Sequence, residues 1–159
     1  MNERKQFGLL GALLTGALLS GVTLTNAIAG EHVYTANDPT WKEECGSCHM
    51  AYPPRLLPAS SWRALMSGLD QHFGTDASVD PQTARHITTF LERNAGRERA
   101  SQGSPTLRIT KTRWFLHEHD EVPGRVWRNP KVKSAANCTA CHVRGDKGNF
   151  DEHGIRIPR

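Results

Sequence analysis

Two short stretches decide the fold of this chain: CGSCH at residues 45–49 and CTACH at residues 138–142. They hold all four cysteines of the 159 residues, and in each a histidine directly follows the second cysteine. This spacing is typical of a c-type haem attachment site, where two thiols bond to the porphyrin and the imidazole binds the iron. The sequence therefore predicts two haem c groups. Their covalent tethers are Cys45, Cys48, Cys138 and Cys141, and their first iron ligands are His49 and His142.

Other uses of paired cysteines fit less well. The two motifs start 93 residues apart, whereas the pairs of a zinc ribbon are usually separated by about 15–20 residues. A thioredoxin-type redox pair needs alternating strands and helices around it, and the flanks lack that pattern. A disulfide within either motif would be strained and would not explain the histidine after it.

A second axial ligand is expected for each iron, either histidine or methionine. His72 follows His49 by 23 residues, and His119 precedes His142 by the same 23. This spacing favours His72 as the second ligand of the first iron and His119 as that of the second. Two alternatives stay open. His117 lies two residues from His119, so that on a helix only one of the two faces the iron, and Met66 is a rival to His72.

The remaining candidates have simpler explanations. Met50 adjoins His49, whose ring already occupies the opposite side of the haem plane. His86 lies beside an arginine on a polar helix face and is expected to be solvated or hydrogen-bonded. His32 and His153 lie near the ends of the chain, where side chains are usually exposed.

The first 29 residues have the pattern of a secretory signal peptide. Arg4 and Lys5 precede an apolar run at residues 7–24, and Ala27-Ile28-Ala29 fits a cleavage site. The sequence therefore predicts export through the general pathway and a periplasmic location, with an uncleaved membrane anchor as the alternative. Residues 30–159 would then form the mature protein.

Helix signals recur along residues 30–159. Asp-Pro pairs and Ser or Thr caps stand before apolar residues at helical spacing. They predict helices from 38 into the first motif, from 60 to 74, from 80 to 96, from 110 or 112 to about 123, and over 138–142. The tail at 145–159 is expected to be extended and to dock on the body, since Ile155 and Ile157 alternate with polar residues.

The predicted fold is mostly α, a small two-lobed c-type cytochrome with little regular strand. The polar stretch 96–105 is expected to join a first haem lobe over about residues 30–96 to a second over about residues 105–159. The chain is poor in large aliphatic residues and carries 14 Gly and 9 Pro, so the haems must fill much of the core. A net charge of +4 without basic runs gives no sign of nucleic-acid binding.

The chain resembles the small dihaem cytochromes c of bacterial periplasms. The resemblance rests on five stretches, 62–74 (WRALMSGLDQHFG), 76–91, 114–127 (WFLHEHDEVPGRVW), 133–142 (KSAANCTACH) and 156–159. It implies a mostly helical two-lobed fold, two histidines on each iron, and His72 and His119 as the second ligands. It also implies electron delivery to another haem protein, which in some members is an oxygen-binding monohaem cytochrome.

These observations predict an electron carrier and not an enzyme. Irons with protein ligands on both faces leave no site for substrate, so outer-sphere electron transfer is the expected chemistry. The expected partner is another cytochrome, soluble or membrane-bound. One alternative is the electron-entry subunit of a periplasmic reductase. Another is a haem enzyme such as a peroxidase, which needs an iron that can open.

Overall fold

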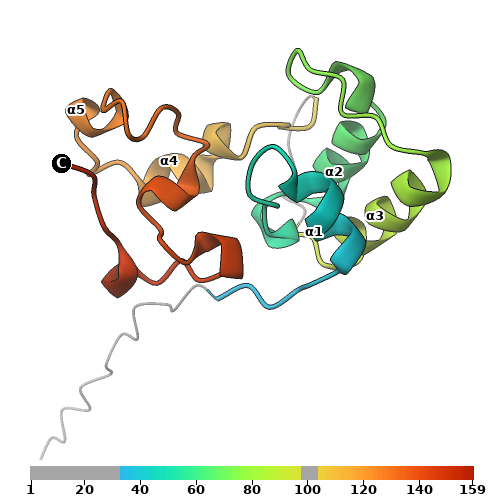
Figure 1. Ribbon diagram of the computed structural model, residues 1–159, viewed down its shortest axis with the longest axis horizontal. Helices are drawn as coiled ribbons and strands as arrows, with labels where there is room; N and C mark the ends of the chain where they lie inside the picture. Colours follow the sequence, from blue (N-terminus) through green and yellow to red (C-terminus); the bar gives the residue numbers. More distant parts are fainter. Residues whose placement is uncertain (1–32, 98–103) are drawn as a thin grey trace, which may run out of the picture.

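The computed structural model describes residues 33–97 and 104–159, and within these ranges the fold is helical (Figure 1). Its α-helices are α1 (Pro39–Gly46), α2 (Ala59–Met66), α3 (Pro81–Arg93), α4 (Arg113–Glu118) and α5 (Gly124–Trp127). Its 3-10 turns are η1 (Pro54–Leu56), η2 (Leu69–Gln71), η3 (Ile109–Lys111), η4 (Cys138–Ala140), η5 (Gly145–Lys147) and η6 (Glu152–Gly154). The described residues pair as extended backbone only in isolated bridges. The prediction of a mostly α fold with little strand is confirmed.

The elements form two groups in space. Helices α1, α2 and α3 pack together at one end, and α4, α5 and the 3-10 turns after residue 137 form the other end (Figure 1). The limits of the two haem lobes, 30–96 and 105–159, stay a prediction.

Three helices begin where the sequence predicts, at side chains that accept a backbone N–H. Asp38 accepts from the amide of Trp41 at 2.8 Å at the start of α1, and Asp80 accepts from Gln82 and Thr83 at the start of α3. Thr112 accepts from the amide of Phe115 at 3.1 Å at the start of α4. Each cap contributes about 1 kcal/mol to helix stability.

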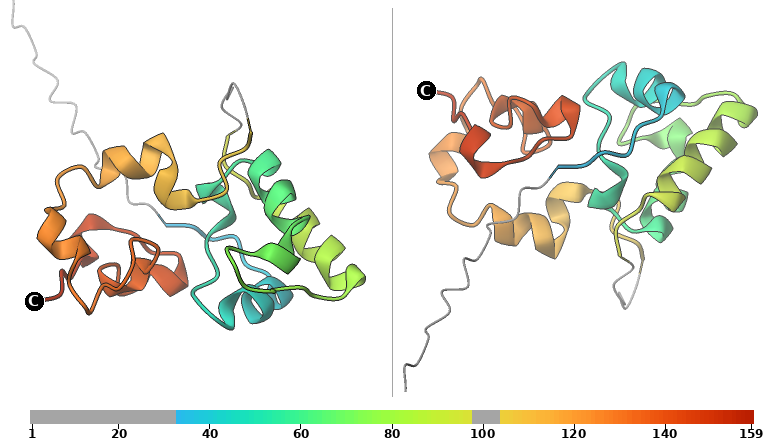
Figure 2. Two further views of the ribbon diagram at one scale, coloured as in Figure 1. Left: turned by 90° about the horizontal axis from the view of Figure 1, so that it is seen from above. Right: turned by 90° about the horizontal axis from the view of Figure 1, so that it is seen from below.

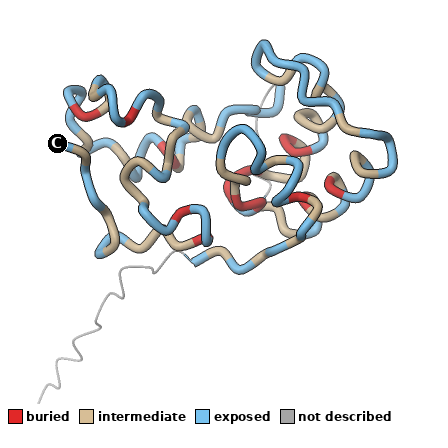
Figure 3. Tube along the Cα trace, in the orientation of Figure 1, coloured by how far each residue is buried: buried red, intermediate tan, exposed pale blue. Residues whose placement is uncertain are grey.

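The apolar core is concentrated in the first group (Figure 3). Its buried cluster consists of Trp41, Leu57, Trp62, Ile87 and Leu91. The second group buries few large apolar side chains among its described residues, namely Phe115, Val126 and Val132. The second group therefore has less apolar packing of its own with which to hold its shape.

The two groups are tied together by the first described residues of the chain. Residues 33–38 run from α1 to the second group (Figure 2). There Val33 bridges to Asn149, and the Tyr34 amide donates to the Gly148 carbonyl at 2.8 Å. Gly148 has a φ of +76°, and a Cβ at this position would overlap the Tyr34 carbonyl oxygen. A glycine is therefore required at this contact.

Several predicted helices are shorter than the sequence indicates. Helix α1 ends at Gly46, so that Cys45 lies in its last turn while Cys48 and His49 lie beyond it. The prediction of one helix through the first motif is therefore wrong for its second half. The helix predicted to end at Gly74 ends at Met66, where Ser67 and a following glycine interrupt it.

The second motif also differs from its prediction. Residues 138–142 form the 3-10 turn η4 and one further turn hydrogen bond, from the His142 amide to the Cys138 carbonyl at 2.8 Å, in place of an α-helix. The predicted docking of the tail is confirmed beside it. Ile155 bridges to His142, and the Arg156 amide donates to the Cys141 carbonyl at 2.9 Å. The short helix α5 was not predicted, because Pro123-Gly124 indicates the end of a helix and not its start.

The predicted signal peptide at 1–29, His32 and the middle of the predicted linker, residues 98–103, lie outside the described residues. Within the part that is described, the search for a helix long and apolar enough to cross a membrane found none.

Candidate metal centres

The first centre is built at the end of α1. Cys45 is half-buried in the last turn of the helix, and the chain then turns so that Cys48 and His49 follow at the surface. The Nδ1 atom of His49 lies 2.8 Å from the Met50 carbonyl oxygen. Donation of the Nδ1 proton to this carbonyl leaves the Nε2 lone pair free, as in most histidines that bind a metal.

The turn after η2 brings His72 close to His49. His72 ends η2 with a ψ of 87°, and Phe73 adopts a φ of +52°, which is rare for an aromatic residue. The chain reverses here through a hydrogen bond from the Thr75 amide to the His72 carbonyl at 3.1 Å. As a result the rings of His49 and His72 face one another, with centres 6.2 Å apart and 30° between their planes.

In the second centre the additional histidine precedes the haem motif along the chain, whereas in the first centre it follows the motif. His119 ends α4, its ring stacks on Phe115 with centres 4.1 Å apart, and its Nδ1 lies 2.9 Å from the Phe115 carbonyl. The ring of His142, from the second motif, lies with its centre 6.2 Å from that of His119, at 72° between the planes. The structure thus brings His119 beside the second motif just as it brings His72 beside the first.

Both separations fit an iron between the rings. An imidazole nitrogen binds a first-row metal at about 2 Å and lies about 1.1 Å from its ring centre, so two imidazoles on opposite faces of one iron have centres about 6 Å apart. Two such rings can turn about their common axis, so both interplanar angles are compatible with this arrangement. The donor sets therefore match haem iron with two histidine ligands.

The surroundings of His72 and His142 also favour metal binding. The Nδ1 atoms of His72 and His142 are buried without a hydrogen-bond partner. Burial, followed by His49 and the Arg108 guanidinium, lowers the pKa of His72 below its ordinary value. Burial, followed by His119, does the same to the pKa of His142. Both shifts favour the neutral imidazole, which is the form that binds a metal.

Two of the thiols, Cys45 and Cys138, are poor candidates for redox chemistry of their own. All four cysteines are free. Burial raises the pKa of Cys45 to about 11, with a contribution from Glu44, and burial raises the pKa of Cys138 to about 11. Reactive thiols have lowered pKa values instead. These two thiols are therefore better suited to permanent tethers than to dithiol exchange.

Aromatic side chains surround both pairs. The ring of Tyr52 lies 4.8 Å from that of His49, and the ring of Phe150 lies 5.1 Å from that of His142. Burial raises the pKa of Tyr52 to about 12. Arg108 reaches the first centre from the far side of the linker, with its guanidinium carbon 4.0 Å from the centre of the Phe73 ring.

The other candidate ligands lie away from both pairs. His117 has a side chain that is 81% exposed and lies 3.9 Å from Asp120. His153 is 88% exposed and lies 2.9 Å from Asp151. Met66 packs against the core cluster of the first group. Of the sequence candidates, His72 and His119 are the ones that the structure places opposite a motif histidine.

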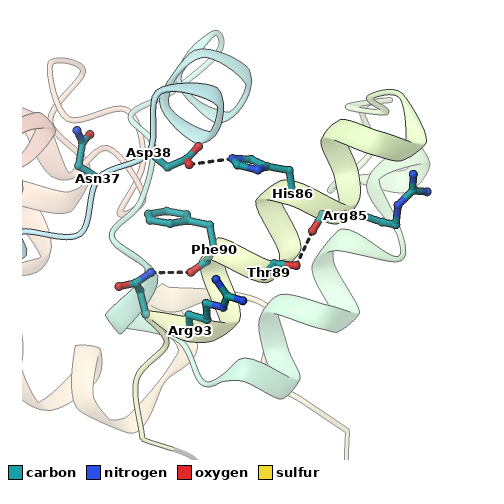
Figure 4. A pocket seen from close by; sticks show the side chains of 8 residues that line it. Asn37, Asp38, Arg85, His86, Thr89, Phe90 and Arg93 are labelled. Carbon is teal, nitrogen blue, oxygen red and sulfur yellow. Dashed lines mark hydrogen bonds and ion pairs between the residues drawn. The ribbon is translucent and has the colours of Figure 1, made fainter.

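His86 takes part in a separate feature, a hollow beside α3 (Figure 4). Its Nε2 lies 2.8 Å from the Asp38 carboxylate, so that it links α3 to the cap of α1. Phe90 lines the same hollow and packs on Trp41, with ring centres 5.2 Å apart. No histidine of the two pairs lines it, and it serves the packing of the helices.

Tyr52 and Arg108 were not among the residues that the sequence patterns indicated. Tyr52 stands three residues after His49 and just before Pro53, so its closeness to the motif was visible in the sequence. Arg108 carried no such signal, because its contact with Phe73 depends on how the chain returns after the linker.

Comparisons with known proteins agree with this geometry. A family model for dihaem cytochrome c matches residues 41–150. A solved dihaem cytochrome c from Rhodobacter sphaeroides is 43% identical with a TM-score of 0.67, over 74% of this chain and 99% of that one. A dihaem cytochrome type c from Shewanella baltica is also 43% identical with a TM-score of 0.67, over 76% of this chain and 92% of that one. A search of curated proteins found no match.

Proposed function

Because the chain belongs to the dihaem cytochrome c family and therefore carries two haem c groups, we propose that it is an outer-sphere electron carrier that delivers electrons to another redox protein. In this role Cys45 and Cys48 hold the first haem, and Cys138 and Cys141 hold the second. The bound haem iron supplies a reversible one-electron change between the ferric and ferrous states.

The axial ligands are the centre of the proposal. His49 and His72 bind the first iron, and His119 and His142 bind the second. The observation that carries this assignment is the separation of the ring centres, which is 6.2 Å in both pairs. Two unrelated segments of the chain reach the same spacing, and that spacing leaves room for one metal atom between the rings.

Closed coordination determines what the protein can do. With the imidazoles of both pairs as ligands, neither iron would have a free position for a substrate or a small gas molecule. The residues hold the rings firmly, since the Nδ1 atoms of His49 and His119 bond to backbone carbonyls. The chain then keeps the same ligands in both oxidation states, which favours fast electron transfer over bond-making chemistry.

The proposal also includes a cellular location and a class of redox partner. Cleavage after Ala29 would release the protein into the periplasm, where haem c is attached after export. The electron acceptor or donor would be another cytochrome, either soluble or membrane-bound. Nothing in the basic residues of the chain suggests a nucleic-acid partner.

Carbon monoxide tests the proposal. The protein, purified with both haems, is reduced with dithionite and exposed to the gas. We expect the absorption bands to stay unchanged, because no coordination position is open. A shift of the bands in the unmodified protein would show an accessible iron and would support a haem enzyme instead of a carrier.

A further inference from the structure

Tyr52 connects the first metal centre with the segment that leads into the second motif. Its ring lies 4.8 Å from the ring of His49, with 31° between the planes. Its hydroxyl donates a hydrogen bond of 2.7 Å to the carbonyl of Ala136, which is 84 residues away in the sequence. One side chain therefore connects an iron ligand of the first centre with the backbone that leads into the second motif.

The far end of this contact is close to a haem tether. The Ala136 carbonyl also accepts from the Cys138 amide at 3.0 Å, and the Cys138 sulfur lies 3.5 Å from the same oxygen. Cys138 is the first thiol of the second motif. The Tyr52 hydroxyl is thus separated from a haem-bound atom by a single carbonyl group.

The backbone that carries Tyr52 is held in place. Pro53 and Pro54 follow it and are buried, and two prolines in succession restrict the chain to few conformations. The indole of Trp62 donates to the Pro54 carbonyl at 2.6 Å, which fixes this segment to α2. The position of the Tyr52 ring is therefore set by the core of the first group and not by the contact with the second.

We propose that Tyr52 couples the two haem sites and is the residue through which electrons pass between them. The inference rests on the proposed carrier function. One electron leaves one iron, which goes from ferrous to ferric, and arrives at the other, which goes from ferric to ferrous. Tyr52 keeps its proton and its electrons throughout. It acts as a bridge that combines the ring contact with His49, the hydrogen bond to the Ala136 carbonyl and the hydrogen bond from the Cys138 amide to that carbonyl.

Two variants separate the parts of the bridge. Tyr52→Phe keeps the ring against His49 and removes the hydrogen bond, while Tyr52→Leu removes both. Exchange NMR on half-reduced protein, at a concentration too low for transfer between molecules, measures the intramolecular electron exchange. We expect several-fold slower exchange in Tyr52→Phe and slower still in Tyr52→Leu, with both haems present and low-spin. Unchanged rates would mean that electrons pass directly between the porphyrin edges, and would overturn the proposal.

Gly148→Ala is the matched control for a purely mechanical role. It weakens the contact between the two groups at Tyr34 and leaves both Tyr52 and its acceptor Ala136 unaltered. We expect its electron exchange to stay near that of the unmodified protein. If Gly148→Ala slows exchange as much as Tyr52→Phe does, then Tyr52 serves only to hold the groups together and the proposal is wrong.

The unmodified protein offers a further test that needs no variant. Because Tyr52 contacts His49 and the backbone just before the second motif, its ring resonances should shift at each of the two one-electron oxidation steps. A shift at one step alone would contradict the bridge. The carbon monoxide experiment is independent of this test. If the gas does not bind and the variants show unchanged electron-exchange rates, only the Tyr52 bridge is refuted. If the gas binds, the carrier function is refuted.

Discussion

The ring of His119 lies nearly parallel to the ring of Phe115, with 4.1 Å between their centres and 17° between their planes. The two residues meet again where His119 Nδ1 lies 2.9 Å from the Phe115 carbonyl. Phe115 is buried, so this double contact holds the imidazole on the inner side of the chain. His117, two residues earlier, points to the solvent.

Replacement of these two histidines should therefore have opposite effects. His119→Ala should open the second iron and produce a high-spin or carbon-monoxide-binding form in about half of the haem. His117→Ala is the control and should stay six-coordinate and low-spin. Absorption spectra of the reduced proteins with and without the gas decide between them, and the reverse pattern would assign the ligand to His117.

The first iron can be tested through its potential. In His72→Met a thioether replaces an imidazole. Because a thioether stabilises the ferric state less well than an imidazole does, the potential of one haem should rise while that of the other stays nearly fixed. A spectroscopic redox titration measures both. His86→Ala should leave both potentials and both spectra unchanged, since His86 bonds to Asp38 and lies away from the pair. A titration of His72→Met identical to that of the unmodified protein would remove His72 from the site.

The two haem motifs and the three capped helix starts could be predicted from the sequence, because each depends on neighbouring residues. Asp38 and Asp80 cap helices that begin with proline, and the signal is contained within a few positions. The ends of the helices were harder to predict. Residues 138–142 form a short turn on which the tail docks through Ile155, and this contact is not visible in the local sequence.

The sequence indicated which histidines lie close together better than it indicated what surrounds them. Equal spacing singled out His72 and His119, and the structure places both opposite a motif histidine. Tyr52 and Arg108 were missed because their partners lie far along the chain, at Ala136 and Phe73. Such contacts depend on how the two groups of elements pack together, which periodicity and caps do not reveal.

Folding of the second group should depend on its haem. Its described residues bury only three large apolar side chains, Phe115, Val126 and Val132, so the porphyrin must supply much of the remaining packing. A variant with Cys138→Ser and Cys141→Ser, expressed with the haem-attachment machinery, should be cleaved by proteases within residues 104–159. Mass spectrometry of the fragments locates the cuts. A native-like thermal transition with full resistance to proteolysis would contradict this dependence.

The contact between Gly148 and Tyr34 should tolerate no side chain. A Cβ on Gly148 would overlap the Tyr34 carbonyl, and the φ of +76° is unfavourable for alanine. Gly148→Ala should therefore lower the free energy of unfolding by at least about 1 kcal/mol. Gly154→Ala is the control, because a Cβ there meets nothing within 4 Å and the backbone is ordinary. Denaturant titrations in which the two variants lose equal stability would show that the contact is unimportant.

The last prediction concerns Asp38, which caps α1 and bonds to His86. The Trp41 amide, together with His86, holds the pKa of Asp38 below its ordinary value, against the opposing effect of burial. A carboxyl whose pKa is lower in the folded state stabilises the fold above its unfolded-state pKa, and this contribution is lost as the pH falls through the folded-state pKa. Asp38→Ala should therefore cost about 1 kcal/mol at pH 7.

The acid range and a second variant make the Asp38 test specific. The difference between Asp38→Ala and the unmodified protein should begin to shrink below pH about 4, the ordinary pKa of an aspartate in the unfolded chain, and should shrink further as the pH falls toward the lower folded-state pKa. Asparagine is also a good helix cap, so Asp38→Asn should retain most of the stability at pH 7 and should not lose the cap in acid. Denaturant midpoints measured from pH 3 to pH 7 provide the comparison. A difference for Asp38→Ala that stays constant across this range would mean that packing, and not the carboxylate, explains the loss.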